Sequence, residues 1–176
     1  SARITAGWVA AGAIATQILN SLGIEILAWV NQIYNIKCEL PQSEITTNLI
    51  EDSLVRCPDK KASQQMIEAI EQAKNEGDSL GGIIACVINN CPVGLGEPIF
   101  DKFNASLGKA ILSLNAVKGV QFGIGFDAVN FKGSELNDGF TKQNGKILTN
   151  SNHSGGIQGG ITNGMPVYFE TAFKPT

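Results

Sequence analysis

The chain has 176 residues, of which 43% are apolar and 16% charged, and its net charge is −3. This composition is typical of a globular protein, and we expect a single domain over residues 1–176. The acidic balance argues against a nucleic-acid-binding protein, and no apolar run reaches the length of a membrane span.

The cysteines contain no C-x-x-C pair, and His153 is the only histidine beside them. A metal site therefore has too few ligands at the usual spacing. The sequence predicts free, mostly buried thiols in a reducing compartment, at Cys38, Cys57, Cys86 and Cys91.

The first predicted element is an amphipathic helix over residues 1–22, with Gly23 placed to cap it. Its apolar face is formed by Ala11, Ile14, Ala15, Ile18, Leu19 and Leu22. Small residues on the same helix would allow close packing against a neighbour: Ala6, Gly7, Ala10 and Gly12. The chain starts inside this helix without Met, so we expect its natural N-terminus to lie upstream.

Residues 24–36 are rich in strand formers and predict one long strand with a bulge. Residues 41–53 are polar and predict irregular structure. A second helix is predicted to open at Cys57-Pro58-Asp59 and to close at Glu76-Gly77-Asp78. Its apolar stripe is formed by Met66, Ile67, Ile70 and Ala73.

Residues 81–91 are apolar on both faces and predict a strand that is covered on both sides. After a turn-rich connector, Asn104 is a plausible N-cap for a helix with Leu107, Ala110 and Ile111 facing inward. Residues 115–122 predict a strand, and residues 133–150 are polar, with an Asn144-Gly145 hairpin tip. The irregular alternation of helices and strands favours an α+β or layered α/β class.

Residues 152–164 contain five glycines, at positions 155, 156, 159, 160 and 164. This density predicts tight bends and a backbone that approaches either a ligand or another strand closely. A plain surface connection is the alternative. No Gly-Lys-Ser/Thr follows, so the stretch is not a P-loop.

The residues by themselves form no self-contained catalytic set. His153 could donate a proton or stabilise the glycine stretch. The acids Asp127, Glu135 and Asp138 fit either acid/base work or a solvated loop. Lys174 and Arg3 are the candidate cations for binding a phosphate group.

Several separated motifs, taken in order, resemble the chorismate synthase family. They are Ser1-Ala2-Arg3-Ile4-Thr5, residues 9–15, Cys57-Pro58-Asp59, residues 76–79, 92–101 and 115–120, the glycine stretch with Asn152-His153, and Lys174-Pro175-Thr176. The resemblance runs from end to end of the chain but covers only the middle of a family member. The segments that carry the family's two catalytic histidines and its C-terminal arginine and aspartate motif lie outside it.

The resemblance implies a layered β-α-β sandwich, here incomplete, and a homotetramer. It implies a lyase of the shikimate pathway, and thus of aromatic amino acid biosynthesis. This lyase converts 5-enolpyruvylshikimate 3-phosphate to chorismate, and it uses reduced FMN with NADPH as a source of electrons. Neither a membrane nor a nucleic-acid partner is implied. The location implied is the cytoplasm, or the plastid where the organism has one.

Carried over by motif, the residues that contact FMN are Ser1, Asn115, Ala116, Gly159, Lys174, Pro175 and Thr176. Arg3 falls where the family contacts the substrate. No catalytic residue of the family is identifiable in the chain, and no metal is implied. We therefore predict an enzyme whose isolated 176 residues are inactive, and the alternative is a non-catalytic segment or interaction module with the same scaffold.

Overall fold

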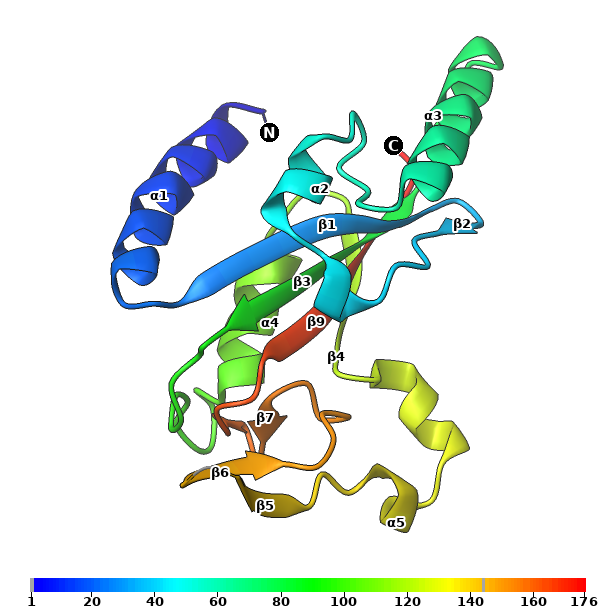
Figure 1. Ribbon diagram of the computed structural model, residues 1–176. Helices are drawn as coiled ribbons and strands as arrows, with labels where there is room; N and C mark the ends of the chain where they lie inside the picture. The colour runs from blue at the N-terminus through cyan, green and yellow to red at the C-terminus, as the bar shows by residue number, and fades with distance from the viewer. Residues whose placement is uncertain (1, 144) are drawn as a thin grey trace. The chain divides into compact units, whose positions relative to one another are not determined.

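The computed structural model describes residues 2–143 and 145–176. The chain divides into two compact units. Unit 1 comprises Ser1–Ile26, Val87–Ala110 and Gln121–Phe169, and unit 2 comprises Leu27–Cys86, Ile111–Val120 and Glu170–Thr176. The predicted α+β class is confirmed (Figure 1). The single domain over residues 1–176 stays a prediction.

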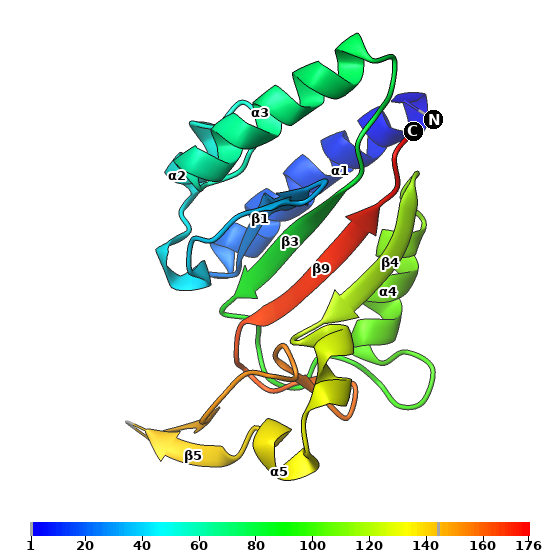
Figure 2. The same ribbon diagram turned by 90° about the vertical axis from the view of Figure 1, so that its right-hand side faces the viewer.

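Among the described residues, the largest sheet has five strands in the order β2-β1-β3-β9-β4. Figure 2 shows β1, β3, β9 and β4 side by side in this order. Their bounds, in that order, are Ile36–Lys37, Glu25–Ile33, Gly82–Asn89, Val167–Phe173 and Val117–Phe122. In β9, buried and half-buried residues alternate with the period of a strand. The described helices include none with the length and apolar character that a membrane span requires.

The first helix, α1, spans Ala2–Ser21 and ends at Gly23, whose φ of +78° suits glycine. The helix itself is as predicted, but its apolar side chains are exposed: Ile14, Ile18 and Leu22 each keep more than half of their surface. Gly7 and Gly12 have no atoms near the space that a side chain would fill. The close packing expected of the small residues is thus absent from the part of the chain that the structure describes, where these positions of α1 are exposed.

The strand expected over residues 24–36 forms as β1 up to Ile33, but its continuation to residue 36 is wrong, because the chain reverses after Ile33. Tyr34 adopts φ +54°, and β1 and β2 pair antiparallel through Ile33↔Ile36. Tyrosine is not a usual turn residue, so composition hid this hairpin. Trp29 of β1 is 3% exposed, whereas Trp8 of α1 is 42% exposed.

The segment expected to be irregular contains η1 (Gln42–Glu44) and a short helix, α2 (Thr47–Glu51). The next helix, α3, spans Lys60–Asn75, and its N-cap is Asp59. The Asp59 carboxylate accepts hydrogen bonds from the N–H groups of Lys61 and Ala62, and Gly77 follows the helix with a positive φ. Both predicted ends of this helix are therefore confirmed.

A small core in unit 2 joins α3 to the β1–β2 hairpin. Its buried members are Cys57, Ala62 and Met66, and partly buried side chains surround them: Val30, Ile33, Ile36, Cys38 and Val55. Met66 has no exposed surface. All four cysteines are free thiols, and three of them are buried, as predicted.

Strand β3 is buried at Ala85, Cys86 and Val87, as expected for a strand covered on both sides. Helix α4 spans Phe103–Leu112, so Asn104 lies inside its first turn and is not the N-cap. Of the residues predicted to face inward, Ile111 is buried but Ala110 is exposed.

The rest of unit 1 consists of short elements before β9. They are η2 (Gly125–Asn130), α5 (Gly133–Leu136), β5 (Phe140–Gln143), β6 (Lys146–Thr149), β7 (Ile157–Gln158) and β8 (Ile161–Thr162). Strands β5 and β6 pair antiparallel, with Gln143 opposite Lys146. This register confirms the hairpin, and Gly145 at its tip has φ +80°; Asn144 lies outside the described residues.

Candidate functional site

Two stretches that the sequence predicts to bind the cofactor lie side by side in unit 2. Asn115 and Ala116 connect α4 to β4, and Lys174-Pro175-Thr176 follow β9. The Lys174 N–H donates to the Ala116 carbonyl oxygen at 3.0 Å. Positions that are far apart in sequence thus meet at one end of two neighbouring strands.

The connection at Ala116 is held in a strained backbone conformation. Ala116 has φ +65°, in the left-handed region that costs an L-residue about 1–2 kcal/mol. The preceding turn is closed by a hydrogen bond from Leu114 N–H to Ile111 O. Strain of this kind persists where the surroundings fix it, and it is concentrated at functional sites.

The donors at this end suit an anion. Asn115, Lys174 and Thr176 are exposed and offer an amide, an ammonium group and a hydroxyl. The Lys174 ammonium donates to the Pro175 carbonyl oxygen at 2.8 Å rather than to a carboxylate. It is therefore a point charge that a phosphate can recruit without first breaking an ion pair.

The glycine stretch belongs to unit 1, where its backbone packs against the chain itself. A Cβ at Gly155 would lie 2.4 Å from Gly123 N and 2.7 Å from Tyr168 O. A Cβ at Gly156 would lie 2.6 Å from Pro166 O. Of the two predicted alternatives, a ligand or another strand, the structure shows a close approach to other backbone at both glycines.

Gly159, the predicted flavin contact in this stretch, differs from those two glycines. It is exposed, and no atom lies within 4 Å of the position of its missing Cβ. Gly159 and Gly160 form the two-residue turn between β7 and β8, with φ of +61° and +87°. Positive φ at both positions is what a type I′ hairpin turn requires, so the turn by itself explains glycine at 159.

The stretch is anchored by a buried acid, Asp138. Its carboxylate accepts hydrogen bonds from the Ser151 hydroxyl at 2.6 Å, the His153 N–H at 2.9 Å and the Ser154 N–H at 2.8 Å. Burial by itself raises the pKa of Asp138, but these hydrogen bonds outweigh it and lower the pKa to about 2. Asp138 is therefore a structural anion, and the solvated loop expected for it is wrong.

His153 lies beside this anchor. Its Nδ1 is 3.3 Å from the Leu136 carbonyl oxygen and 3.5 Å from Asp138 Oδ1. The geometry favours the loop-stabilising interpretation of this histidine. The two other acids considered for catalysis, Asp127 and Glu135, are exposed. The Glu135 carboxylate accepts a hydrogen bond from the Lys132 N–H at the start of α5.

The remaining predicted site residues are not part of unit 2. Arg3 is exposed in the first turn of α1 and belongs to unit 1, as Gly159 does. Ser1 lies outside the described residues. Unit 2 therefore assembles Asn115, Ala116 and the residues after β9.

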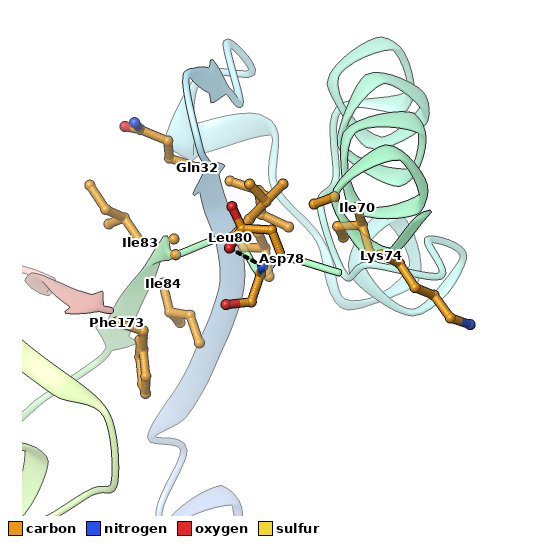
Figure 3. Close-up of a pocket in the computed structure, with 14 residues that line it drawn as sticks. Gln32, Ile70, Lys74, Asp78, Leu80, Ile83, Ile84 and Phe173 are labelled. Carbon is orange, nitrogen blue, oxygen red and sulfur yellow. Dashed lines mark hydrogen bonds between the residues drawn. The ribbon is translucent and has the colours of Figure 1, made fainter. Parts of the chain in front are cut away.

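Unit 2 also contains an apolar cavity of about 510 Å³ (Figure 3). Aliphatic side chains from β1, α3 and the start of β3 line most of it, together with Phe173. The charged side chains of the lining are Lys74 and Asp78, and in Figure 3 the Lys74 ammonium extends away from the cavity. This lining does not suit a phosphate-bearing ligand.

The family model described as "Chorismate synthase" matches residues 1–176, the whole chain. The chain belongs to the chorismate synthase family. Among relatives named chorismate synthase, the protein of Phocaeicola vulgatus is 50% identical over 175 residues, covering 99% of this chain and 49% of its own length. That of Prochlorococcus marinus is 51% identical over 179 residues, covering 100% of this chain and 49% of its own length.

A solved structure described as "Crystal Structure of Chorismate Synthase" superposes with a TM-score of 0.88 at 34% identity. The match covers 99% of this chain and 56% of the other, which confirms the predicted chorismate synthase fold. The chain spans about half the length of the curated relatives that it matches.

Two features of the site escaped the sequence. The sequence does not signal the left-handed φ of Ala116, because alanine rarely adopts the left-handed region of backbone conformation. Asp138 lies in a polar stretch whose composition predicts a solvent-exposed loop. Only the fold shows that Ser151, His153 and Ser154 donate hydrogen bonds to its carboxylate.

Proposed function

We propose that this chain is part of an enzyme, a chorismate synthase that converts 5-enolpyruvylshikimate 3-phosphate to chorismate and phosphate. The family match over residues 1–176 supports the proposal. The structural observation behind the proposal is the hydrogen bond from Lys174 N–H to Ala116 O. It joins two motifs of the family resemblance at one end of the sheet, where exposed donors suit an anion.

The donor set at this end fits FMN. Lys174 would supply the charge for the FMN phosphate, and Asn115 and Thr176 would supply neutral hydrogen bonds. Ala116 and Pro175 would bring the backbone against the cofactor, and Ser1 and Gly159 complete the proposed set. When bound, reduced FMN would supply the transient electron that helps phosphate leave the substrate, and NADPH is the proposed source of reducing equivalents.

Arg3 would bind the substrate. A guanidinium group matches carboxylate and phosphate in a bidentate fashion, and the substrate carries both groups. The exposed position of Arg3 in the first turn of α1 leaves it accessible to a ligand. The proposed setting is a homotetramer in the cytoplasm, or in a plastid.

The second candidate is a non-catalytic segment with the family's scaffold. The observation in its favour is that His153, the single histidine of the sequence, contacts the loop through Leu136 O and Asp138. Proton transfer requires a positioned acid or base within reach of the substrate. We therefore expect the isolated 176-residue chain to bind FMN without turning over the substrate.

A chimera distinguishes these candidates. Residues 1–176 would replace the matching segment of the Dehalococcoides mccartyi chorismate synthase, a 49% identical relative. Under anaerobic conditions with reduced FMN, the chimera should release phosphate from 5-enolpyruvylshikimate 3-phosphate and the isolated chain should not. A folded chimera without phosphate release would favour the non-catalytic alternative.

Two substitutions in the chimera test the assigned residues. Lys174→Ala should weaken FMN binding about tenfold, about 1.4 kcal/mol, without loss of stability. Lys60→Ala removes another exposed lysine of unit 2, outside the motifs assigned to FMN, and is the matched control. Arg3→Ala should raise KM and leave the FMN titration unchanged. Equal FMN affinity in the two lysine variants would contradict the role of Lys174.

A further inference from the structure

Two cysteines from different segments share the small core of unit 2. Cys38 follows β2 directly, and Cys57 lies two residues before the N-cap of α3. Cys57 is 1% exposed, and Cys38 packs against the same cluster while staying partly exposed. Cys38 is therefore the more accessible residue of the pair.

Hydrogen bonds hold the two segments together. The Cys38 N–H donates to Asn31 O at 2.8 Å, and the next residue, Glu39, donates its N–H to the Asp59 carboxylate at 3.2 Å. The Cys57 thiol donates to Asp59 O at 3.7 Å. Both segments are thus tied to Asp59, and Cys38 packs against the cluster in which Cys57 is buried.

The other cysteines are in different surroundings. Cys86 is buried in β3, and Cys91 lies near Thr162 in unit 1. Neither belongs to the cluster that contains Cys57. Within the described chain, Cys38 and Cys57 are therefore the cysteines that share one hydrophobic cluster.

We propose that Cys38 and Cys57 are a modification site, at which small-molecule disulfides such as oxidised glutathione produce a reversible intramolecular disulfide. The Cys38 thiolate attacks one sulfur of oxidised glutathione and releases one glutathione thiol. The Cys57 thiol then loses its proton to solvent, attacks the Cys38 sulfur of the mixed disulfide, and releases the second glutathione. The two cysteines lose two electrons and the glutathione disulfide gains them.

The order of the two attacks follows from accessibility. Burial raises the pKa of Cys57 to about 12, so its thiolate is scarce and a bulky disulfide cannot reach it. Once Cys38 carries glutathione, the attack by Cys57 is intramolecular, and proximity compensates for the scarce thiolate. The closed bond would join the end of β2 to the start of α3 and enclose η1 and α2 in a covalent loop.

The test treats the full chain with oxidised glutathione and follows its intact mass and its tryptic peptides. We expect the mass to fall by two hydrogens, with a cross-linked peptide that contains Cys38 and Cys57. The bond should form at least about tenfold faster in the native chain than in guanidinium-unfolded chain, because the fold holds the thiols together. Dithiothreitol should reverse it.

Single substitutions assign the order of attack. Cys57→Ser should stop the reaction at a stable glutathione adduct on Cys38, Cys38→Ser should leave the native chain unmodified, and Cys86→Ser should react as the unsubstituted chain does. The proposal is overturned if the unsubstituted chain keeps a glutathione adduct without the cross-linked peptide. It is equally overturned if the bond forms no faster in the native chain than in the unfolded one.

Discussion

The glycine stretch of unit 1 and the Lys174 end of unit 2 both hold backbone at positive φ, but for different reasons. At Gly155 and Gly156 the space that a side chain would need is filled by the chain's own backbone. At Ala116 a left-handed residue carries a side chain and lies beside exposed donors. Packing within the fold explains the positive φ of the two glycines. The positive φ of Ala116 lies beside exposed donors that could bind a ligand. Glycine density alone therefore marks close packing rather than a binding site.

The largest effect is expected from Gly155→Ala. The new methyl group would collide with Gly123 N and Tyr168 O, and φ +66° would strain the residue. We expect a loss of about 3 kcal/mol in the free energy of unfolding, measured by denaturant titration. A loss below about 1 kcal/mol would contradict the close backbone packing that defines this region.

Asp138→Asn should have the next largest effect. The folded-state pKa of Asp138 is about 2, below the ordinary 3.8, so the ionised carboxylate stabilises the fold above about pH 4. That contribution, about 2 kcal/mol, is lost as the pH falls from 4 towards 2.

The variant should lack this contribution at neutral pH and show a flatter stability profile between pH 4 and pH 2. The measurement is denaturant titration across that range. Asp127→Asn, at an exposed acid of the same unit, is the control and should leave the profile unchanged. Parallel profiles for Asp138→Asn and the unsubstituted chain would show that this carboxylate does not hold the loop.

Gly159→Ala separates turn chemistry from cofactor contact. Open space surrounds the site, but φ +61° predicts a loss of about 1 kcal/mol in stability. If flavin lies against this backbone, the methyl group should also lower FMN affinity at least about tenfold, as measured by flavin titration.

Gly145→Ala is the matched control, because Gly145 is also an open hairpin glycine, with φ +80°. It should lose similar stability and bind FMN normally. If the two variants bind FMN equally well, Gly159 is a turn residue and nothing more.

The smallest effect is expected from Ala116→Gly. Glycine relieves the left-handed strain but adds entropy to the unfolded chain, so we expect a net gain of about 0.5 kcal/mol. Thermal denaturation measures it, and Ala110→Gly in the exposed part of α4 should instead destabilise by about 1 kcal/mol. A loss of stability at position 116 would mean that its backbone is not left-handed.

Local signals predicted much of the fold. Asp59 and Gly77 mark the ends of α3, and the Asn144-Gly145 pair indicated the β5–β6 hairpin, because caps and turns depend on neighbouring residues. The reversal at Tyr34 is local, but tyrosine is not a usual turn residue. The burial of Asp138 depends on distant partners, so no short window of sequence contains it. The exposed face of α1 shows the same limit, since periodicity predicts an apolar face but not what covers it.

The proposed site depended on recognition more than on residue chemistry. Spacing offered only Lys174 and Arg3 as cations for a phosphate. Ala116 entered through the resemblance, and its strained φ and its hydrogen bond to Lys174 became visible only in the fold. Gly159 was also assigned through the resemblance, but the positive φ of the β7–β8 turn is a second explanation for glycine at this position.

The two tryptophans differ in burial, and each belongs to a different unit. Trp29 of unit 2 is 3% exposed and donates its indole N–H to Asn31 Oδ1, whereas Trp8 of unit 1 is 42% exposed. Indole fluorescence shifts to longer wavelength in water, so Trp29 should emit to the blue of Trp8. In the single variants Trp8→Phe or Trp29→Phe, the remaining tryptophan is a fluorescent reporter for one unit. Cofactor uptake or thiol oxidation in unit 2 can then be followed through Trp29 alone, without an added label.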